Sequence, residues 1–471
     1  MNSILREDLS AIEGLFETIK NEGLSYLNNI QNAPTSVINK ELSTRKIEPE
    51  GKGSLAALNE FNERFREVIV ASSGPRYWGY VTGGSTPASI AGDWLASVYD
   101  QNTQTIKGTG DISGLIEFET ISLLLDLFGL PHDFSGGFVT GATMSNFTCI
   151  STARQWVGTQ SGYDIAKDGL SGISQLKVLC ATPHSSAVKS LSMLGIGSRN
   201  IIIVNCLKDN REAMDIASLE DELRKLDDEP CIIISSAGTV NSGDFDDFEA
   251  ISRIRSKYNF WWHIDGAFGA FAGCSPQYRY LVKGWEAADS ITVDCHKWLN
   301  VPYESAVYFI NKKHAILQAE TFQNSNAPYL GNTEDNFNFL NVLPENSRRL
   351  KALPVWFSLV AYGKDTYTKL VEENIHQARL FAEKLIETSK YELMVPVRLN
   401  IVAFTIKGLT DKQIDHFLNG VNSRGKVFMT PSVYYGRKGI RAAFVNWRTG
   451  VEDINIAVNE MQAVLDKITI I

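Results

Sequence analysis

Four short segments of this 471-residue sequence end or follow apolar runs with residue types that take part in chemistry. They are "GGFVTGATMSNF" (136–147), "TPHSSAVKS" (182–190), "HIDGAFGAF" (263–271) and "TVDCHKWLN" (292–300). The first is a glycine-rich turn leading into a helix that we expect to begin near Met144, and the others present His184, Asp265 and Lys297. Each residue alone has a simpler explanation, such as a helix cap or a solvated side chain. Together they supply backbone amides, an imidazole, a carboxylate and an amine.

One cofactor, pyridoxal phosphate, requires all four kinds of group at once. An amine bonds its aldehyde as a Schiff base, a carboxylate keeps its pyridine nitrogen protonated, side chains cover its ring, and amides at a helix N-terminus bind its phosphate. The predicted residues are Lys297 for the aldehyde, Asp265 for the nitrogen, His184 and Ala267 for the two ring faces, and Gly141, Ala142, Thr143, Met144 and His296 for the phosphate. Desolvation at a strand end would favour the neutral, nucleophilic form of Lys297.

The elements that position these residues follow from the alternation of apolar runs and amphipathic stretches between about 170 and 310. Six runs read as strands: 176–181, 200–205, 230–237, 260–265, 290–295 and 305–310. Helical periodicity separates most of them, which predicts a mostly parallel sheet covered on both faces. Functional sites in such sheets collect at the carboxyl ends of the strands, where His184, Asp265 and Lys297 are found.

The rest of the chain is predicted to form flanking parts around this large α/β domain. We expect a helical N-terminal segment over 1–75, the cofactor-binding domain over 76–350, and a smaller α+β domain over 351–471. The segment 77–90 reads as irregular and glycine-rich before a helix, and 355–389 as a long, interrupted helical stretch. The polar, asparagine-rich stretch 321–347 has no clear periodicity, and loops of this length are often functional or disordered.

Composition excludes several classes of partner. A net charge of −9 argues against nucleic acid and anionic membranes, and no apolar run approaches the length of a membrane span. The N-terminus has no basic start followed by an apolar block, and the six cysteines form no CxxC pair or zinc-like set. We therefore expect a cytoplasmic protein with reduced thiols, no metal, and a small-molecule partner.

The order of these motifs resembles the group II pyridoxal-phosphate-dependent decarboxylases, the family of aromatic amino acid, glutamate, cysteine-sulfinate and histidine decarboxylases. "HIDGAFGAF" and "DCHKWLNVPYESA" carry the resemblance, "SRRLKALPVWFSLVAYG" (347–363) extends it, and it covers about 60–465. It implies a type I aminotransferase-like fold with a mostly parallel seven-stranded sheet, and a homodimer with active sites at the subunit interface. It also implies decarboxylation of an L-amino acid to the amine and carbon dioxide.

Carried over by position, the resemblance implies a role for individual residues. Lys297 is the Schiff-base lysine, Asp265 pairs with the pyridine nitrogen, and His184 stacks on the ring. The phosphate contacts are Thr143, Met144 and His296, and the substrate contacts are Tyr80, Val81, Thr82 and Arg441. A guanidinium such as that of Arg441 can hold a carboxylate in a bidentate manner, although a solvated strand-edge arginine is an equal alternative.

Two departures leave alternatives open. Where the family has a loop tyrosine that protonates the substrate carbon, this chain has Phe337 and Phe339, and Tyr329 lies at a different register. A phenylalanine there accompanies oxygen-dependent aldehyde synthesis in plant members, so an aldehyde synthase is an alternative, as is another carbon–carbon lyase or an aminotransferase on the same fold. In "AGTVNSGDFDD", Val240 replaces a threonine that contacts the cofactor oxygen, and Asn241 is a candidate substitute.

Substrate hints in the sequence point in two directions. Tyr80, Phe322 and Tyr329 would favour an aromatic side chain, whereas Arg441 and Arg348 would serve an acidic one. A non-catalytic interaction protein that has kept only the fold is the alternative from another class, and failure to take up pyridoxal phosphate would distinguish it.

Overall fold

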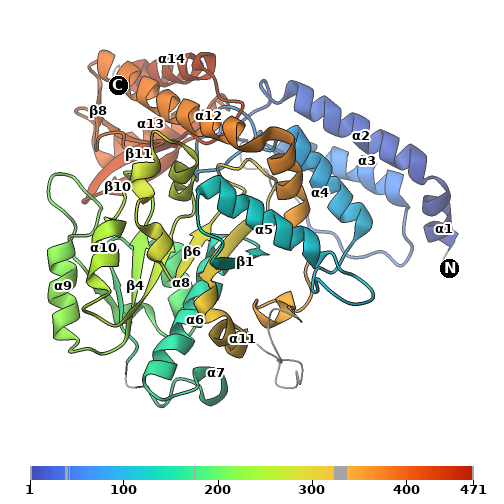
Figure 1. Cartoon of the computed structure of the whole chain (residues 1–471). Coiled ribbons are helices and arrows are strands. Elements are labelled where there is room, and N and C mark those ends of the chain that lie inside the picture. The colour runs from blue at the N-terminus through green and yellow to red at the C-terminus, as the bar shows by residue number, and fades with distance from the viewer. Residues whose placement is uncertain (1–2, 38–40, 42, 174, 323–336, 469–471) are drawn as a thin grey trace.

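The computed structural model describes residues 3–37, 41, 43–173, 175–322 and 337–468. Two sheets and the helices around them make up the chain (Figure 1). The α-helices are α1 (Ser3–Ser10), α2 (Ile12–Asn29), α3 (Ser54–Phe65), α4 (Pro87–Tyr99), α5 (Gly114–Phe128), α6 (Ala142–Gln160), α7 (Ile165–Asp168), α8 (Ser185–Met193), α9 (Ile216–Lys225), α10 (Phe248–Ile254), α11 (Ala315–Phe322), α12 (Ala352–Glu387), α13 (Asp411–Ser423) and α14 (Val451–Ile468).

The larger sheet has seven strands in the order β1-β7-β6-β5-β4-β2-β3. Its strands are β1 (Phe134–Val139), β2 (Val178–Cys180), β3 (Ile201–Ile203), β4 (Cys231–Ser236), β5 (Phe260–Asp265), β6 (Ser290–Val293) and β7 (Ala306–Asn311). Only β7 among these strands runs against its neighbours, so the prediction of a mostly parallel sheet is confirmed. Strands β4 and β5 are almost wholly buried, as expected when helices cover both faces.

The glycine-rich segment differs from its prediction in two respects. Residues 134–139 form the edge strand β1, whose glycines pack closely on Tyr308 of β7. Helix α6 then begins at Ala142, and not near Met144 as predicted. It runs beneath the sheet in contact with β1, β4, β5, β6 and β7. This path brings the first turns of α6 under the carboxyl ends of the central strands.

The C-terminal part has its own antiparallel sheet and core. The sheet order is β10-β11-β9-β8, with β8 (Tyr391–Leu393), β9 (Ile401–Ile406), β10 (Thr430–Tyr434) and β11 (Arg437–Ala443). Helix α12 leads into this part and breaks at Gly363, whose φ of 65° is in the left-handed region, which agrees with the interrupted helix predicted for 355–389. The domain boundaries at 75 and 350 stay predictions.

The N-terminal helices α1, α2 and α3 lie at one side of the molecule, beside α4 (Figure 1). None of these three helices contains a buried residue. In the part of the chain that the structure describes, no helix is both long and apolar enough to cross a membrane. All six cysteines lie in that part too, as free thiols, and five of them are buried.

Candidate active site

Side chains from β2, β5 and β6 converge at the carboxyl edge of the large sheet. His184 caps α8 after β2, Asp265 ends β5, and Lys297 lies on the turn after β6. The convergence has an electrostatic signature at His184. Desolvation lowers the pKa of this imidazole, the charges of Lys297 and Arg441 lower the pKa further, and Asp265 and Asp294 oppose them. The four-part set expected from the sequence therefore meets at one place.

Lys297 is largely enclosed, with 14% of its side chain exposed. Its Nζ lies 2.9 Å from Asp294 Oδ2, and the other carboxylate oxygen of Asp294 accepts the Ala142 N–H at 2.6 Å. Asp294 therefore joins the lysine to the N-terminus of α6, where a negative charge is stabilised. Lys297 is therefore enclosed, as predicted, but it is paired with a carboxylate.

Asp265 is buried beside two donors. Its Oδ2 accepts from Asn146 Nδ2 at 3.0 Å, and its Oδ1 accepts the Ala267 N–H at 3.3 Å. Asn146 is itself fully buried in α6, and its Oδ1 lies 2.9 Å from Nε2 of His263. These contacts orient the Asp265 carboxyl group, whose oxygens can accept from a protonated ring nitrogen.

The turn that we predict to bind phosphate is partly engaged within the protein. The Ala142 amide donates to Asp294, and the Met144 amide donates to the Gly141 carbonyl at 2.9 Å. Thr143 lies between them in the first turn, where amides have no intrahelical acceptor. His296 is mostly buried close to Gly141, and its Nδ1 has no hydrogen-bond partner. An unpaired buried nitrogen beside a helix N-terminus fits a phosphate group.

The segment after Trp78 lies directly on the Lys297 turn. The Gly83 N–H donates to the His296 carbonyl at 3.3 Å, and the Gly84 N–H donates to Asn300 Oδ1 at 2.8 Å. Just before them, Tyr80 and Val81 both have a φ of 57°, which is costly for a β-branched residue. This bend turns Tyr80 outward and buries Val81, and the place of Tyr80 and Val81 on the substrate wall stays a prediction.

Thr82 accepts a hydrogen bond from a tyrosine that follows Lys297 in the sequence. The Tyr303 hydroxyl donates to Thr82 Oγ1 at 3.2 Å, and the Tyr303 ring packs on His296 with centroids 4.3 Å apart. Thr82 and His296 are therefore joined through one aromatic residue that sequence reasoning did not select.

We predict that Gly83→Ala will disrupt the lysine turn. An added Cβ would lie 1.8 Å from the Lys297 carbonyl oxygen, so the backbone must shift. Overpacking of this kind costs about 1–3 kcal/mol or more, and we expect a lower unfolding temperature together with weaker cofactor binding. Gly14→Ala in α2 is the control, since nothing lies within 4 Å of its added Cβ. Equal thermal stability and cofactor binding of the Gly83→Ala and Gly14→Ala proteins would contradict the prediction.

Arg441 is not a solvated strand-edge residue. It lies within β11 and is 9% exposed, its Nη1 donates to the Val240 carbonyl at 3.0 Å, and its buried Nε has no partner. Burial lowers the pKa of this guanidinium, and Glu212 and Tyr80 act in the opposite sense. A buried cation with an unused donor near His184 has the chemistry to bind a carboxylate.

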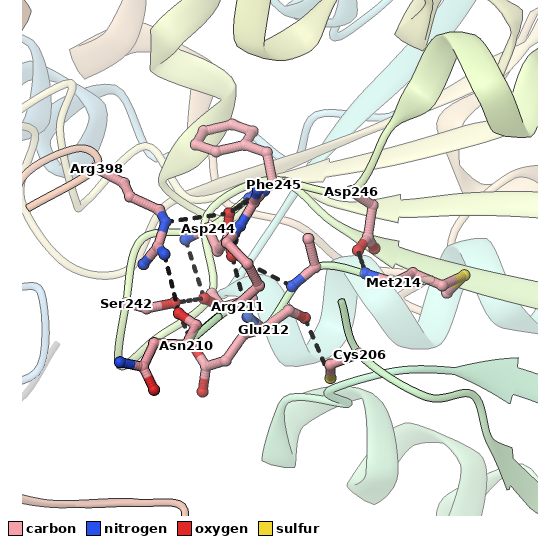
Figure 2. Close-up of polar contacts among 12 residues, drawn as sticks. Cys206, Asn210, Arg211, Glu212, Met214, Ser242, Asp244, Phe245, Asp246 and Arg398 are labelled. Carbon is pink, nitrogen blue, oxygen red and sulfur yellow. Dashed lines mark hydrogen bonds and ion pairs between the residues drawn. The ribbon is translucent and has the colours of Figure 1, made fainter. Parts of the chain in front are cut away.

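A polar cluster beside Arg441 holds the turn at 239–246. Asp244 accepts from Arg211 Nε and Nη2 at 2.7 and 2.9 Å, and Arg398 Nε lies 3.6 Å away. Figure 2 shows both arginines pointing toward this carboxylate, one from the large domain and one from the C-terminal part. Asn241 Nδ2 donates to Glu212 Oε1, and Asn241 Oδ1 accepts from the Ser432 hydroxyl. Asn241 is therefore held between Glu212 and β10.

Asp246 in the same cluster predicts a pH dependence of stability. Burial raises the pKa of Asp246 to about 7, against the opposing effect of the Met214 and Ser236 amides. Because the folded-state pKa lies above the unfolded value, the folded chain binds more protons, and stability falls as the pH rises from about 4 to about 7. Asp246→Asn removes the titrating group and should flatten this slope, although its side chain offers one acceptor oxygen where the Met214 and Ser236 amides use two. Urea unfolding at pH 5, 6, 7 and 8 tests this, and an unchanged slope would refute it.

Three aromatic or basic residues that the sequence analysis singled out contact other residues of the protein. Arg348 is buried, and it donates to Glu117, to the Phe138 carbonyl and to the Thr103 carbonyl. It is therefore unavailable for an acidic substrate. Phe339 is fully buried under the Arg348 guanidinium, and Phe337 packs against it and Phe118. Tyr329 lies outside the described residues.

Besides Tyr303, sequence reasoning missed three polar residues that connect the site. Asp294, Asn146 and Ser186 carry hydrogen bonds between the segments that were predicted. The one available signal was Asp294, an acidic residue three positions before a functional lysine. Asn146 and Ser186 lie in helical stretches that are rich in small polar residues, where nothing distinguishes them.

The fold and site together define a pyridoxal-phosphate enzyme, and comparisons with known proteins agree. A solved structure of Oryza sativa TDC with PLP and tryptamine superposes with a TM-score of 0.88, at 19% identity over 97% of this chain and 98% of that chain. An aromatic-L-amino-acid decarboxylase of Bacillus atrophaeus is 25% identical over 95% of this chain and 94% of its own length. An L-2,4-diaminobutyrate decarboxylase of Acinetobacter baumannii is 27% identical over 62% of this chain and 59% of its length.

Residues 40–407 match the family model described as "Pyridoxal-dependent decarboxylase conserved domain". This match covers well over half of the chain, which therefore belongs to the pyridoxal-dependent decarboxylase family. The chain is thus a carboxy-lyase whose cofactor is pyridoxal 5'-phosphate.

Proposed function

We propose that this enzyme decarboxylates an L-amino acid to the amine and carbon dioxide, with its cofactor bonded covalently to Lys297. The observation that carries the proposal is the convergence of Lys297, Asp265 and His184 at one sheet edge. When bound, pyridoxal phosphate accepts the electrons that the departing carboxylate leaves behind.

The residues of the chain would hold and orient the reacting groups. Asp265 would keep a proton on the ring nitrogen, His184 and Ala267 would cover the ring, and the Thr143 amide with His296 would bind the phosphate. Arg441, with its unused buried Nε, would bind a carboxylate of the substrate. Before the chemical step begins, these groups would already orient the substrate bond that is to break.

The substrate class is tested by a screen. The relatives described above act by name on aromatic amino acids and on L-2,4-diaminobutyrate, and Tyr80 is exposed, so that it can contact a substrate side chain. Carbon dioxide, amine and hydrogen peroxide should be measured for the common amino acids, cysteine sulfinate and 2,4-diaminobutyrate. We expect one amine per carbon dioxide without peroxide. Equal amounts of aldehyde, peroxide and carbon dioxide would instead establish an aldehyde synthase, which is the assignment of a solved neighbour from Rhodiola rosea.

The same proposal includes a homodimer. Helices α1–α3 bury none of their residues within one chain, yet they expose Leu5, Leu9, Ile12, Phe16, Ile19, Leu24, Leu55 and Phe61. A second copy of this chain is the partner that we propose for this apolar face. Light scattering should then give twice the 52.3 kDa chain mass, and a mass of one chain would contradict it.

A further inference from the structure

A buried chain of hydrogen bonds runs beneath the cofactor contacts. Trp261 Nε1 donates to Ser290 Oγ at 3.0 Å, Ser290 Oγ lies 2.9 Å from His263 Nδ1, and His263 Nε2 lies 2.9 Å from Asn146 Oδ1. All four side chains are fully buried, and they come from β5, β6 and α6. These hydrogen bonds therefore link the middle of the sheet to α6, the helix whose first turn is predicted to bind the phosphate.

Each hydrogen bond in this chain has a fixed direction. An indole N–H only donates, so the Ser290 oxygen accepts from Trp261. The Asn146 amide nitrogen faces Asp265 and Ser186, which leaves its Oδ1 to accept from His263 Nε2. Burial lowers the pKa of His263 to about 4, so the imidazole is neutral at pH 7. A neutral His263 protonated on Nε2 then accepts the Ser290 proton at Nδ1.

Asn146 uses both amide protons on residues of the site. One goes to Asp265 Oδ2 at 3.0 Å and the other to Ser186 Oγ at 3.1 Å. The Ser186 hydroxyl is then free to donate to His184 Nδ1, which lies 2.7 Å away and also accepts the Ser186 N–H at 3.2 Å. With Nδ1 as an acceptor, the proton of a neutral His184 must be on Nε2.

We propose that Asn146 is a positioning residue that holds Asp265 as a carboxylate and sets His184 in the tautomer protonated on Nε2. The inference rests on the proposed function, because Asp265 and His184 are the cofactor residues named there. The Asn146 amide then positions both Asp265, the proposed partner of the ring nitrogen, and His184, the residue proposed to cover the ring face. Loss of the Asn146 hydrogen bonds would then affect the cofactor through Asp265 and His184.

The test compares four variants of the full chain for binding of pyridoxal phosphate to the apoprotein. Asn146→Leu keeps the shape without donors, and should weaken cofactor affinity by about 10- to 100-fold. It should also move the acid-side transition of the bound cofactor's absorbance to higher pH, because Asp265 loses a donor. Asn146→Asp places a second carboxylate against Asp265, so the pair shares a proton and a new transition should appear near neutral pH.

One further variant tests the contacts from Asn146 through Ser186 to His184 separately from the contact with Asp265. Another variant controls for packing. Ser186→Ala removes the donor to His184 but leaves the Asp265 contact, so affinity should stay within about threefold while the pH profile of kcat/KM shifts. Thr148→Val is the matched control, since Thr148 is fully buried in the same helix and its hydroxyl bonds the Met144 carbonyl of that helix. It should bind cofactor as the wild type does.

The outcomes distinguish this inference from the proposed function. Failure of the wild-type apoprotein to bind pyridoxal phosphate would remove the proposed function. Wild-type binding that both Asn146 variants reproduce within about twofold, with an unchanged absorbance profile, would overturn the inference alone. An equal loss of affinity in Thr148→Val would also overturn it, because the effect would then be one of packing in α6.

Discussion

Lys297→Ala is expected to abolish covalent attachment of pyridoxal phosphate and to lower decarboxylation by roughly four orders of magnitude or more. Lys297 provides the amine that reaches the carboxyl edge of the sheet beside Asp265 and His184. Alanine has no group that can bond an aldehyde, and Asp294 loses its cation at the same time. Borohydride reduction of the loaded enzyme followed by peptide mapping measures the attachment directly.

Lys351→Ala is a close control for this experiment. Lys351 is 12% exposed and lies 2.7 Å from Glu304, whereas Lys297 is 14% exposed and lies 2.9 Å from Asp294. Both substitutions therefore remove an enclosed lysine from an ion pair, and only one removes the proposed attachment point. A reduced adduct that persists in Lys297→Ala, or is lost in Lys351→Ala, would refute the assignment.

Glu117→Ala is expected to destabilise the fold by about 3–5 kcal/mol, because it leaves the buried Arg348 charge without its counter-ion. Arg348 Nη2 lies 2.5 Å from Glu117 Oε1, and both side chains are almost fully buried. Glu117 also accepts the Phe138 N–H at 2.8 Å, so the pair joins α5, the strand β1 and the segment that enters α12. Urea and thermal unfolding of the apoprotein provide the measurement.

An exposed ion pair provides the comparison for Glu117. Glu222→Ala in α9 breaks the contact to Lys225, which is 2.6 Å long and open to solvent, and should cost less than about 1 kcal/mol. Replacing both buried partners, as Glu117→Leu with Arg348→Met, should be less harmful than Glu117→Ala alone, since no charge stays unpaired. A Glu117→Ala protein as stable as Glu222→Ala would show that the buried pair does not hold this region together.

Much of the fold could be predicted because local sequence patterns determine it. The β-branched and apolar runs that became β2 to β7 are short, and turn residues and amphipathic helices separate them. The strand β1 was missed because its glycines resemble a turn, although they serve close packing against Tyr308. Lys297, Asp265 and His184 could be selected because each follows or ends a strand.

The connecting residues could not be predicted because their partners are far away in the sequence. Asp294 meets Ala142 across 152 residues, and Arg348 meets Glu117 across 231. Asn146 lies in a helix that is buried on most of its surface, so no polar face marks it out. A sequence pattern reports what a residue is near in the chain, and these roles depend on what it meets in space.

The residues that meet at the site are far apart in the sequence, and this separation has a consequence for how the enzyme folds. The polar contacts of the site close loops of 119 residues at Asn146 and Asp265, and of 216 residues at Gly84 and Asn300. Contacts at such separation form slowly, because the entropy of closing the loop precedes the gain from the contact. The cofactor pocket should therefore be complete only when almost the whole chain has folded. Uptake of pyridoxal phosphate is then a probe of finished folding, and excess cofactor should pull the folding equilibrium toward the native state.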